Sequence, residues 1–236
     1  MRSLRPNALC AVAFLISLGT NYIFGETVTP PPTNKYSAEV AKFGYLTAPE
    51  PGGILLVGSS IFRRWTNSVT DLAPLPVTNR AFGGSHTSHQ LMFFDQVVSP
   101  CRPQLIVWYC GSNDIKGKKD PKEVLARTEE WLDKVKKLDP SIQVLLVSIH
   151  RSPQKRKDGQ IEGVDAVNRG YQELSKKRDG VFYVDVNPVL ENAKGESKED
   201  LYVADGLHLN IKGYQQMATL LKPVMEKYWK MKESNP

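Results

Sequence analysis

Five short apolar runs alternate with longer amphipathic stretches along this chain, and the alternation limits the folds that it can adopt. GILLVG at residues 53–58 and LIVWYCG at 105–111 are rich in leucine and β-branched residues, which is typical of strands buried on both faces. Further runs predict strands at 76–82, 143–149 and 181–186. Apolar residues at helical spacing predict helices over 121–139, 164–178 and 211–229. Such alternation predicts a parallel sheet covered by helices on both faces.

The first residues have the pattern of an export signal. Arg2 and Arg5 supply the positive start, and an apolar run at 8–19 follows that is too short for an ordinary transmembrane helix. Small residues favour cleavage after Gly19 or Gly25. The pattern predicts a secreted or periplasmic protein.

The signal peptide is therefore expected over residues 1–25, with a proline-rich tether or surface arm over 26–40 and one folded domain over 41–232. Two alternatives remain open, an uncleaved membrane anchor and lipidation at Cys10. After cleavage no stable membrane anchor is expected. The oligomeric state is not fixed by the sequence.

The composition suits one globular domain without nucleic-acid binding. The chain has 236 residues, of which 41% are hydrophobic and 24% charged, so it can form a packed core. The formal net charge of +6 is spread along the chain, and neither an RNA-binding aromatic motif nor zinc-finger spacing occurs. A solvated basic surface explains this charge.

Cys101 and Cys110 are expected to be free, buried thiols. The residues between them form a predicted strand, which would separate the two Cα atoms by up to roughly 30 Å. A disulfide needs these atoms within about 7 Å. Neither cysteine has a metal-ligand spacing.

Polar residues of catalytic types follow several of the predicted strands. In parallel sheets, ligands bind beyond the carboxyl ends of the strands. Each of these segments taken alone is an ordinary turn or helix cap, and only their order and shared location give them weight. They are Ser59 and Ser60, FGGSHTSH at 82–89, GSND at 111–114, and DGLHLN at 205–210.

These residue types fit acyl transfer. A serine becomes a good nucleophile when a histidine takes its proton and a carboxylate orients that histidine. Asp205 and His208 could form that pair. The tetrahedral intermediate needs fixed hydrogen-bond donors, which the Gly84 N–H and the Asn113 amide could provide.

The same segments resemble the SGNH (GDSL-type) hydrolases over residues from about 50 to 228. VGSSI is similar to the family's first block, NRAFGGS to the second, GSND to the third and DGLHLN to the fifth. The resemblance implies a three-layer α/β/α flavodoxin-like sandwich with a five-stranded parallel sheet, and no metal or cofactor. It implies the following roles: Ser60 as nucleophile, His208 as base, Asp205 as the residue that orients it, and Ser60, Gly84 and Asn113 as oxyanion donors.

The first block departs from the family pattern at one position. Ser59 stands where the family usually has aspartate, which removes a negative charge beside the site. The block also lacks the second glycine of the G-x-S-x-G elbow, which argues against the larger α/β-hydrolase fold.

The resemblance is nearest to platelet-activating-factor acetylhydrolase catalytic subunits and bacterial carbohydrate acetylesterases. It implies an exported serine esterase that removes short acyl groups, with acetyl esters of carbohydrates as the expected substrates. No long apolar insertion separates the blocks, so a small acyl pocket is expected. The alternatives are a thioesterase or lysophospholipase on the same fold, and a non-catalytic carbohydrate- or partner-binding protein.

A basic segment at 150–159 follows the fourth predicted strand and is expected near the rim of the site. Its cations either form a solvated loop or attract an anionic glycan. They are Arg151, Lys155, Arg156 and Lys157.

Overall fold

The structure is a computed structural model that describes residues 35–230. Its centre is one parallel sheet with the strand order β2-β1-β3-β4-β5, which is the flavodoxin-like order. The strands are β1 (Ile54–Gly58), β2 (Val77–Asn79), β3 (Leu105–Tyr109), β4 (Gln143–Val147) and β5 (Val181–Val184). All five predicted strands are present, each shorter than its apolar run.

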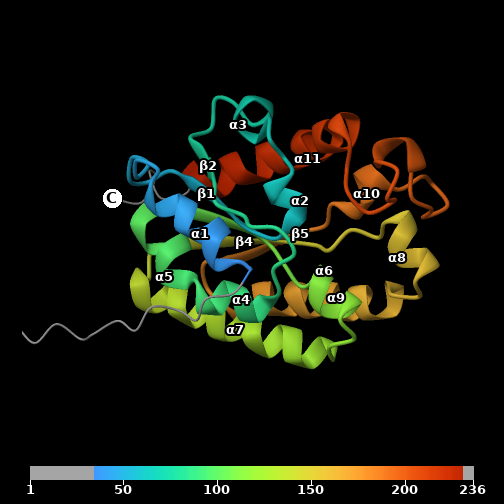
Figure 1. Cartoon of the computed structure of the whole chain (residues 1–236), viewed down its shortest axis with the longest axis horizontal. Coiled ribbons are helices and arrows are strands. Elements are labelled where there is room, and N and C mark those ends of the chain that lie inside the picture. The colour runs from blue at the N-terminus through green and yellow to red at the C-terminus, as the bar shows by residue number, and fades with distance from the viewer. Residues whose placement is uncertain (1–34, 231–236) are drawn as a thin grey trace, which may run out of the picture. The chain divides into compact units, whose positions relative to one another are not determined.

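Helices cover both faces of the sheet, as Figure 1 shows with α7 and α9 on one side and α3 and α11 on the other. The longer helices are α1 (Ser37–Gly44), α7 (Pro121–Leu138), α9 (Ile161–Lys177) and α11 (Ile211–Lys230). The shorter α-helices are α2 (Ser60–Arg63), α3 (Ser68–Asp71), α4 (Thr87–Met92), α5 (Phe94–Val97), α6 (Ser112–Lys116), α8 (Pro153–Lys157) and α10 (Asn187–Leu190). Two 3₁₀ turns are η1 (Ser99–Cys101) and η2 (Glu199–Leu201).

Alternate residues of each central strand point into two separate cores. Leu55 of β1 packs in the core beneath α1, α5, α7 and α9, whereas its neighbour Leu56 packs beneath α2 and α11. All residues of β1 and β3 are buried, because side chains of a strand alternate between faces and both faces are covered here. The predicted three-layer α/β/α sandwich is confirmed.

The chain order around β1 creates a switch point in the sheet. β1 pairs with β2 on one side and with β3 on the other, so the chain changes direction across the sheet at β1. Crevices at such switch points, beyond the carboxyl ends of the strands, are the usual ligand sites of open α/β sheets. Residues that follow β1 and β3 therefore face one another.

Two other features bear on the sequence-based expectations. Cys101 and Cys110 are both free and buried, as predicted. The expected boundary between tether and domain, at residues 40 and 41, falls inside α1, whose Val40 is part of a hydrophobic core.

The predicted signal peptide lies outside the described residues. Within residues 35–230, no helix is both long and apolar enough to cross a membrane.

Candidate active site

Ser60 lies at the turn between β1 and α2. Gly58 ends the strand with φ +148°, and a Cβ on it would lie 2.0 Å from the Tyr109 carbonyl oxygen, so the close approach of β1 and β3 requires glycine here. The next N–H, of Ser59, donates to that same carbonyl at 3.1 Å. The turn buries Ser59 and leaves Ser60 half-buried as the first residue of α2.

Ser60, His208 and Asp205 form one hydrogen-bonded chain. The His208 Nε2 lies 2.9 Å from the Ser60 Oγ, and its Nδ1 lies 2.6 Å from the Asp205 Oδ2. A carboxylate accepts, so Nδ1 carries the proton and Nε2 is free to accept from the serine hydroxyl. The structure thus joins residues 148 positions apart in the sequence into the arrangement that serine activation requires.

The loop before α11 holds the Asp205 carboxylate in place. Its Oδ1 accepts from the backbone N–H groups of Leu207 and His208, both at 2.9 Å. Burial acts to raise the pKa of Asp205, but the hydrogen bonds from the His208 backbone and ring outweigh it and lower the pKa to about 2. Asp205 is therefore ionised across the neutral range, and its charge is available to stabilise a protonated His208.

Burial and the carboxylate act in opposite directions on His208. Burial lowers the pKa of His208, while the hydrogen bond and charge of Asp205 raise it, and the net result lies below the ordinary 6.5. A histidine with a lowered pKa is neutral at pH 7 and can take a proton from serine. The ring is mostly covered, with 12% of its side chain exposed.

The two further oxyanion candidates lie in segments that follow β2 and β3 and are tied to the Ser60 turn. Gly84 adopts φ +70° in the loop after β2, and Asn113 lies in α6, directly after β3. The Asn113 Nδ2 donates one hydrogen to the Ser85 carbonyl at 2.9 Å, and within residues 35–230 its second amide hydrogen has no protein acceptor and can serve a ligand. The Ser85 hydroxyl in turn lies 3.3 Å from the Gly58 carbonyl.

Sequence reasoning missed a buried residue that supports the His208 loop. His150, directly beyond β4, places its Nε2 3.0 Å from the Leu207 carbonyl and its Nδ1 2.6 Å from the Tyr109 hydroxyl. Burial lowers the pKa of His150 well below its ordinary value, so the neutral ring donates to Leu207 and accepts from Tyr109. The only sequence signal was its position at a strand end.

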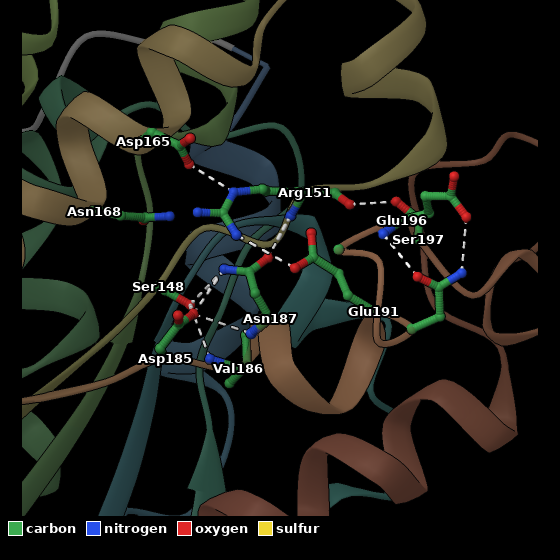
Figure 2. A network of polar contacts seen from close by, with 12 residues as sticks. Ser148, Arg151, Asp165, Asn168, Asp185, Val186, Asn187, Glu191, Glu196 and Ser197 are labelled. Carbon is green, nitrogen blue, oxygen red and sulfur yellow. Dashed lines mark hydrogen bonds and ion pairs between the residues drawn. The ribbon is translucent and has the colours of Figure 1, made fainter.

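The basic segment 150–159 does not form a cationic rim. The Arg151 guanidinium bonds to Asp165 at 2.7 Å and to Glu191 at 3.3 Å (Figure 2), and Arg156 pairs with Glu191 at 2.6 Å. Lys155 is buried, and burial lowers its pKa to about 7. Of the four cations, only Lys157 is both exposed and without an ion-pair partner within residues 35–230.

This network has a structural role instead. The Arg151 backbone N–H donates to the Asn187 Oδ1 at 2.7 Å, and the Ser197 hydroxyl donates to the Arg151 backbone carbonyl at 2.6 Å. Figure 2 shows α9, α10 and the 191–197 loop meeting at Arg151, with Asp165 and Glu191 on its guanidinium and Asn187 and Ser197 on its backbone. The segment is therefore not a freely solvated loop, because partners distant in sequence pair with its arginines. Attraction of an anionic glycan by its exposed cations stays a prediction.

No group of three or more histidine, cysteine, aspartate or glutamate side chains is placed to hold a metal ion within residues 35–230. The hydrogen-bonded arrangement of Ser60, His208 and Asp205 has the groups that nucleophilic acyl transfer uses.

Comparisons with known proteins find a matching family and several solved structures with the same fold. A family model for GDSL-like lipases and acylhydrolases matches residues 47–216. A protein from Streptococcus pneumonia assigned as a platelet activating factor shares 26% identity, with a TM-score of 0.71, over 80% of this chain and 91% of that one. A search of curated proteins found no match.

Two further solved structures share the fold at lower identity. A GDSL-like lipase from Bacteroides thetaiotaomicron is 20% identical, with a TM-score of 0.68, and covers 82% of this chain and 98% of that one. A family 3 carbohydrate esterase from Clostridium thermocellum is 13% identical, with a TM-score of 0.61, and covers 76% and 98%. The family match spans most of the chain and includes every site residue, and the chain therefore belongs to the GDSL-like lipase/acylhydrolase family of hydrolytic esterases.

Proposed function

We propose that this esterase is exported and hydrolyses short-chain acyl esters, chiefly acetyl esters of carbohydrates, through an acyl-enzyme on Ser60. The observation that supports this most is the hydrogen-bonded chain from Asp205 through His208 to Ser60. A hydroxyl, a neutral imidazole and an ionised carboxylate in that order are the parts that serine nucleophilic catalysis uses.

In the proposed first step, the Ser60 Oγ attacks the ester carbonyl while its proton moves to the His208 Nε2. The carbonyl oxygen becomes an oxyanion that accepts hydrogen bonds from the Ser60 and Gly84 N–H groups and the Asn113 amide. The intermediate then breaks its bond to the alcohol, which leaves with the proton from His208.

In the second step, a water molecule gives a proton to His208 and attacks the acyl-enzyme. The second tetrahedral intermediate collapses to the free acid, and Ser60 regains its proton. Asp205 stays ionised throughout and stabilises the imidazolium that forms in each half-reaction. Neither step requires an oxidant, a reductant or a metal.

The carbohydrate substrate class is supported by a shared fold. The Clostridium thermocellum neighbour is a family 3 carbohydrate esterase. At 13% identity the two proteins share the fold, and the carbohydrate substrate is our proposal for this chain. The preference for short acyl groups is supported by the absence of a long apolar insertion between the four motif segments of the sequence. A larger acyl chain would need additional apolar surface to cover it.

A panel of p-nitrophenyl esters tests the acyl preference. We expect acetyl and propionyl esters to be hydrolysed with kcat/KM at least about tenfold higher than the octanoyl ester, because a small pocket excludes a long chain. Acetylated oligosaccharides in the same assay test the alcohol side. Preference for the octanoyl ester would contradict the short-acyl proposal and favour a lysophospholipase, and preference for acyl thioesters would favour a thioesterase.

Export is proposed from the amino-terminal pattern alone. Expression of the full chain in a bacterial host, followed by amino-terminal sequencing of the exported fraction, is expected to find a mature protein that begins after Gly19 or Gly25. A protein that keeps Met1 and stays with the membrane would support the uncleaved anchor instead. A fatty-acyl group on Cys10 would indicate a lipoprotein.

A further inference from the structure

The short helix α1 precedes the region that matches the family, yet it contacts the proposed oxyanion loop. The family match begins at residue 47, whereas α1 spans Ser37–Gly44. Tyr36 and Val40 are 5% and 2% exposed and belong to a hydrophobic core of the domain. The helix is therefore an integral part of the described fold and can act on its neighbours.

Tyr36, at the N-cap of α1, holds the backbone carbonyl group of Gly84. Its hydroxyl donates to the Gly84 carbonyl oxygen at 2.9 Å. The ring is held by packing, since its centroid lies 6.0 Å from that of Phe82, edge-on, and 4.1 Å from that of His89. An aromatic ring confined on two sides is a rigid anchor for this hydrogen bond.

Glu39, one turn further along α1, fixes the other side of the loop. Its Oε2 accepts from the Gly83 N–H at 3.2 Å. Its Oε1 pairs with the Arg63 Nε, and Arg63 is the last residue of the helix that begins with Ser60. Glu39 thus connects the glycine loop to the helix that carries the nucleophile.

These two contacts bracket the peptide group that carries the Gly84 N–H. Glu39 bonds the peptide group before it and Tyr36 bonds the one after it. The Gly84 N–H itself has no acceptor among residues 35–230, so it remains available for an oxyanion. Two successive glycines have wide conformational freedom, and an oxyanion donor is effective only when its direction is fixed before the reaction.

We propose that Tyr36 and Glu39 are positioning residues that hold the Gly84 N–H toward the oxyanion, so that α1, outside the matched region, completes the active site. This inference rests on the proposed function, because it assigns a task within that reaction. Neither side chain is placed in contact with the reacting atoms.

Conservative variants test the role of Tyr36. Tyr36→Phe keeps the packed ring and removes only the hydroxyl, so we expect kcat for an acetyl ester to fall about tenfold while KM changes less than about twofold. Tyr45→Phe is the matched control, because it removes the same atom from a side chain that is 89% exposed at the end of α1. The control is expected to keep wild-type kinetics.

Glu39 offers a rescue experiment. Glu39→Ala removes the acceptor for the Gly83 N–H and is expected to lower kcat about tenfold. Glu39→Gln restores one acceptor oxygen and is expected to recover much of that loss, although it does not restore the charge that pairs with Arg63. Glu130→Ala, at an exposed position of α7, is the matched control.

A trifluoromethyl ketone separates positioning from stability. The ketone forms a tetrahedral adduct with the serine. The oxyanion of that adduct accepts hydrogen bonds from the same donors as the oxyanion of the transition state. We expect its affinity to fall by the same factor as kcat/KM in Tyr36→Phe and Glu39→Ala. Thermal unfolding of each variant, measured in parallel, reports any general loss of the fold.

The outcomes are distinct. If Tyr36→Phe and Glu39→Ala bind the ketone and turn over like the wild type, or lose only thermal stability, the positioning role is wrong while the proposed function stands. If the wild type hydrolyses no ester and binds no ketone, the proposed function fails and this inference fails with it.

Discussion

Replacing Ser60 with alanine is expected to lower kcat for an acetyl ester by about 10⁴- to 10⁶-fold, which is the scale of triad losses in serine hydrolases. The substitution removes the oxygen that lies 2.9 Å from the His208 Nε2 and leaves no attacking atom in that position. Covalent labelling by a fluorophosphonate probe should disappear as well. A steady-state ester assay measures the fall in kcat, and gel fluorescence of the labelled protein measures the loss of labelling.

Ser59→Ala is the matched control for this prediction. Ser59 is buried, and within residues 35–230 its hydrogen bonds are made by its backbone N–H and carbonyl groups, which alanine retains. We expect kcat to change by less than about tenfold, the loss that one ordinary side-chain contact can account for, and labelling to persist. A label on Ser59, or near-normal turnover by Ser60→Ala, would contradict the nucleophile assignment.

Replacing Asp205 with asparagine has the second largest expected effect, a fall in kcat of about 10³- to 10⁴-fold. Asparagine can donate to the His208 Nδ1 and thereby move the ring proton to Nε2. A protonated Nε2 can no longer accept the proton of Ser60. The carboxylate also raises the pKa of His208, so its loss should lower that pKa further. The acid limb of kcat/KM in the residual activity should therefore move to lower pH.

Asp200→Asn is the control for the charge change, since Asp200 is exposed in η2, a few residues earlier in the same part of the chain. We expect its kcat and pH profile to match those of the wild type. Equal kinetics for Asp205→Asn and Asp200→Asn would mean that Asp205 does not orient the base. A full pH series from the acid to the neutral range measures both predictions.

The layers of this fold could be predicted because the signal is local. Strands buried on both faces need continuous apolar runs, as in β1 and β3, and helices between them need an apolar stripe, as in α7. The predicted ends of β3 and β4 were less accurate. Cys110 and Ile149 lie just beyond the last strand residues and are buried apolar residues, so the apolar run continues past the end of each strand. α1 was partly assigned to the tether, because only tertiary contacts show that Tyr36 and Val40 are buried.

The candidate site was predictable to the extent that its residues follow strands. The motifs at 111–114 and 205–210 have distinctive spacing, and the parallel sheet brings strand ends together. The supporting residues Tyr36, Glu39 and His150 could not be identified in the same way. Each acts through one hydrogen bond to the backbone of a distant loop, and no sequence pattern encodes such a contact.

The basic segment shows that a local run of cations does not reveal how many of them are free. A run of cations reads as a solvated or ligand-binding surface, yet Arg151 and Arg156 share Glu191 and Lys155 is buried. Partners from α9 and the 191–197 loop could be recognised only in three dimensions. Local charge counts therefore do not indicate which arginines are free.

Mapping the acyl-enzyme tests the central claim most directly. The wild-type protein is mixed with p-nitrophenyl acetate, quenched in acid within milliseconds, digested with pepsin and analysed by tandem mass spectrometry. The account predicts a burst of p-nitrophenol together with a single acetyl group on Ser60, which disappears as the substrate is exhausted. Steady turnover with no acetylated peptide, or an acetyl group on any other residue that forms and decays at the rate of turnover, would contradict it.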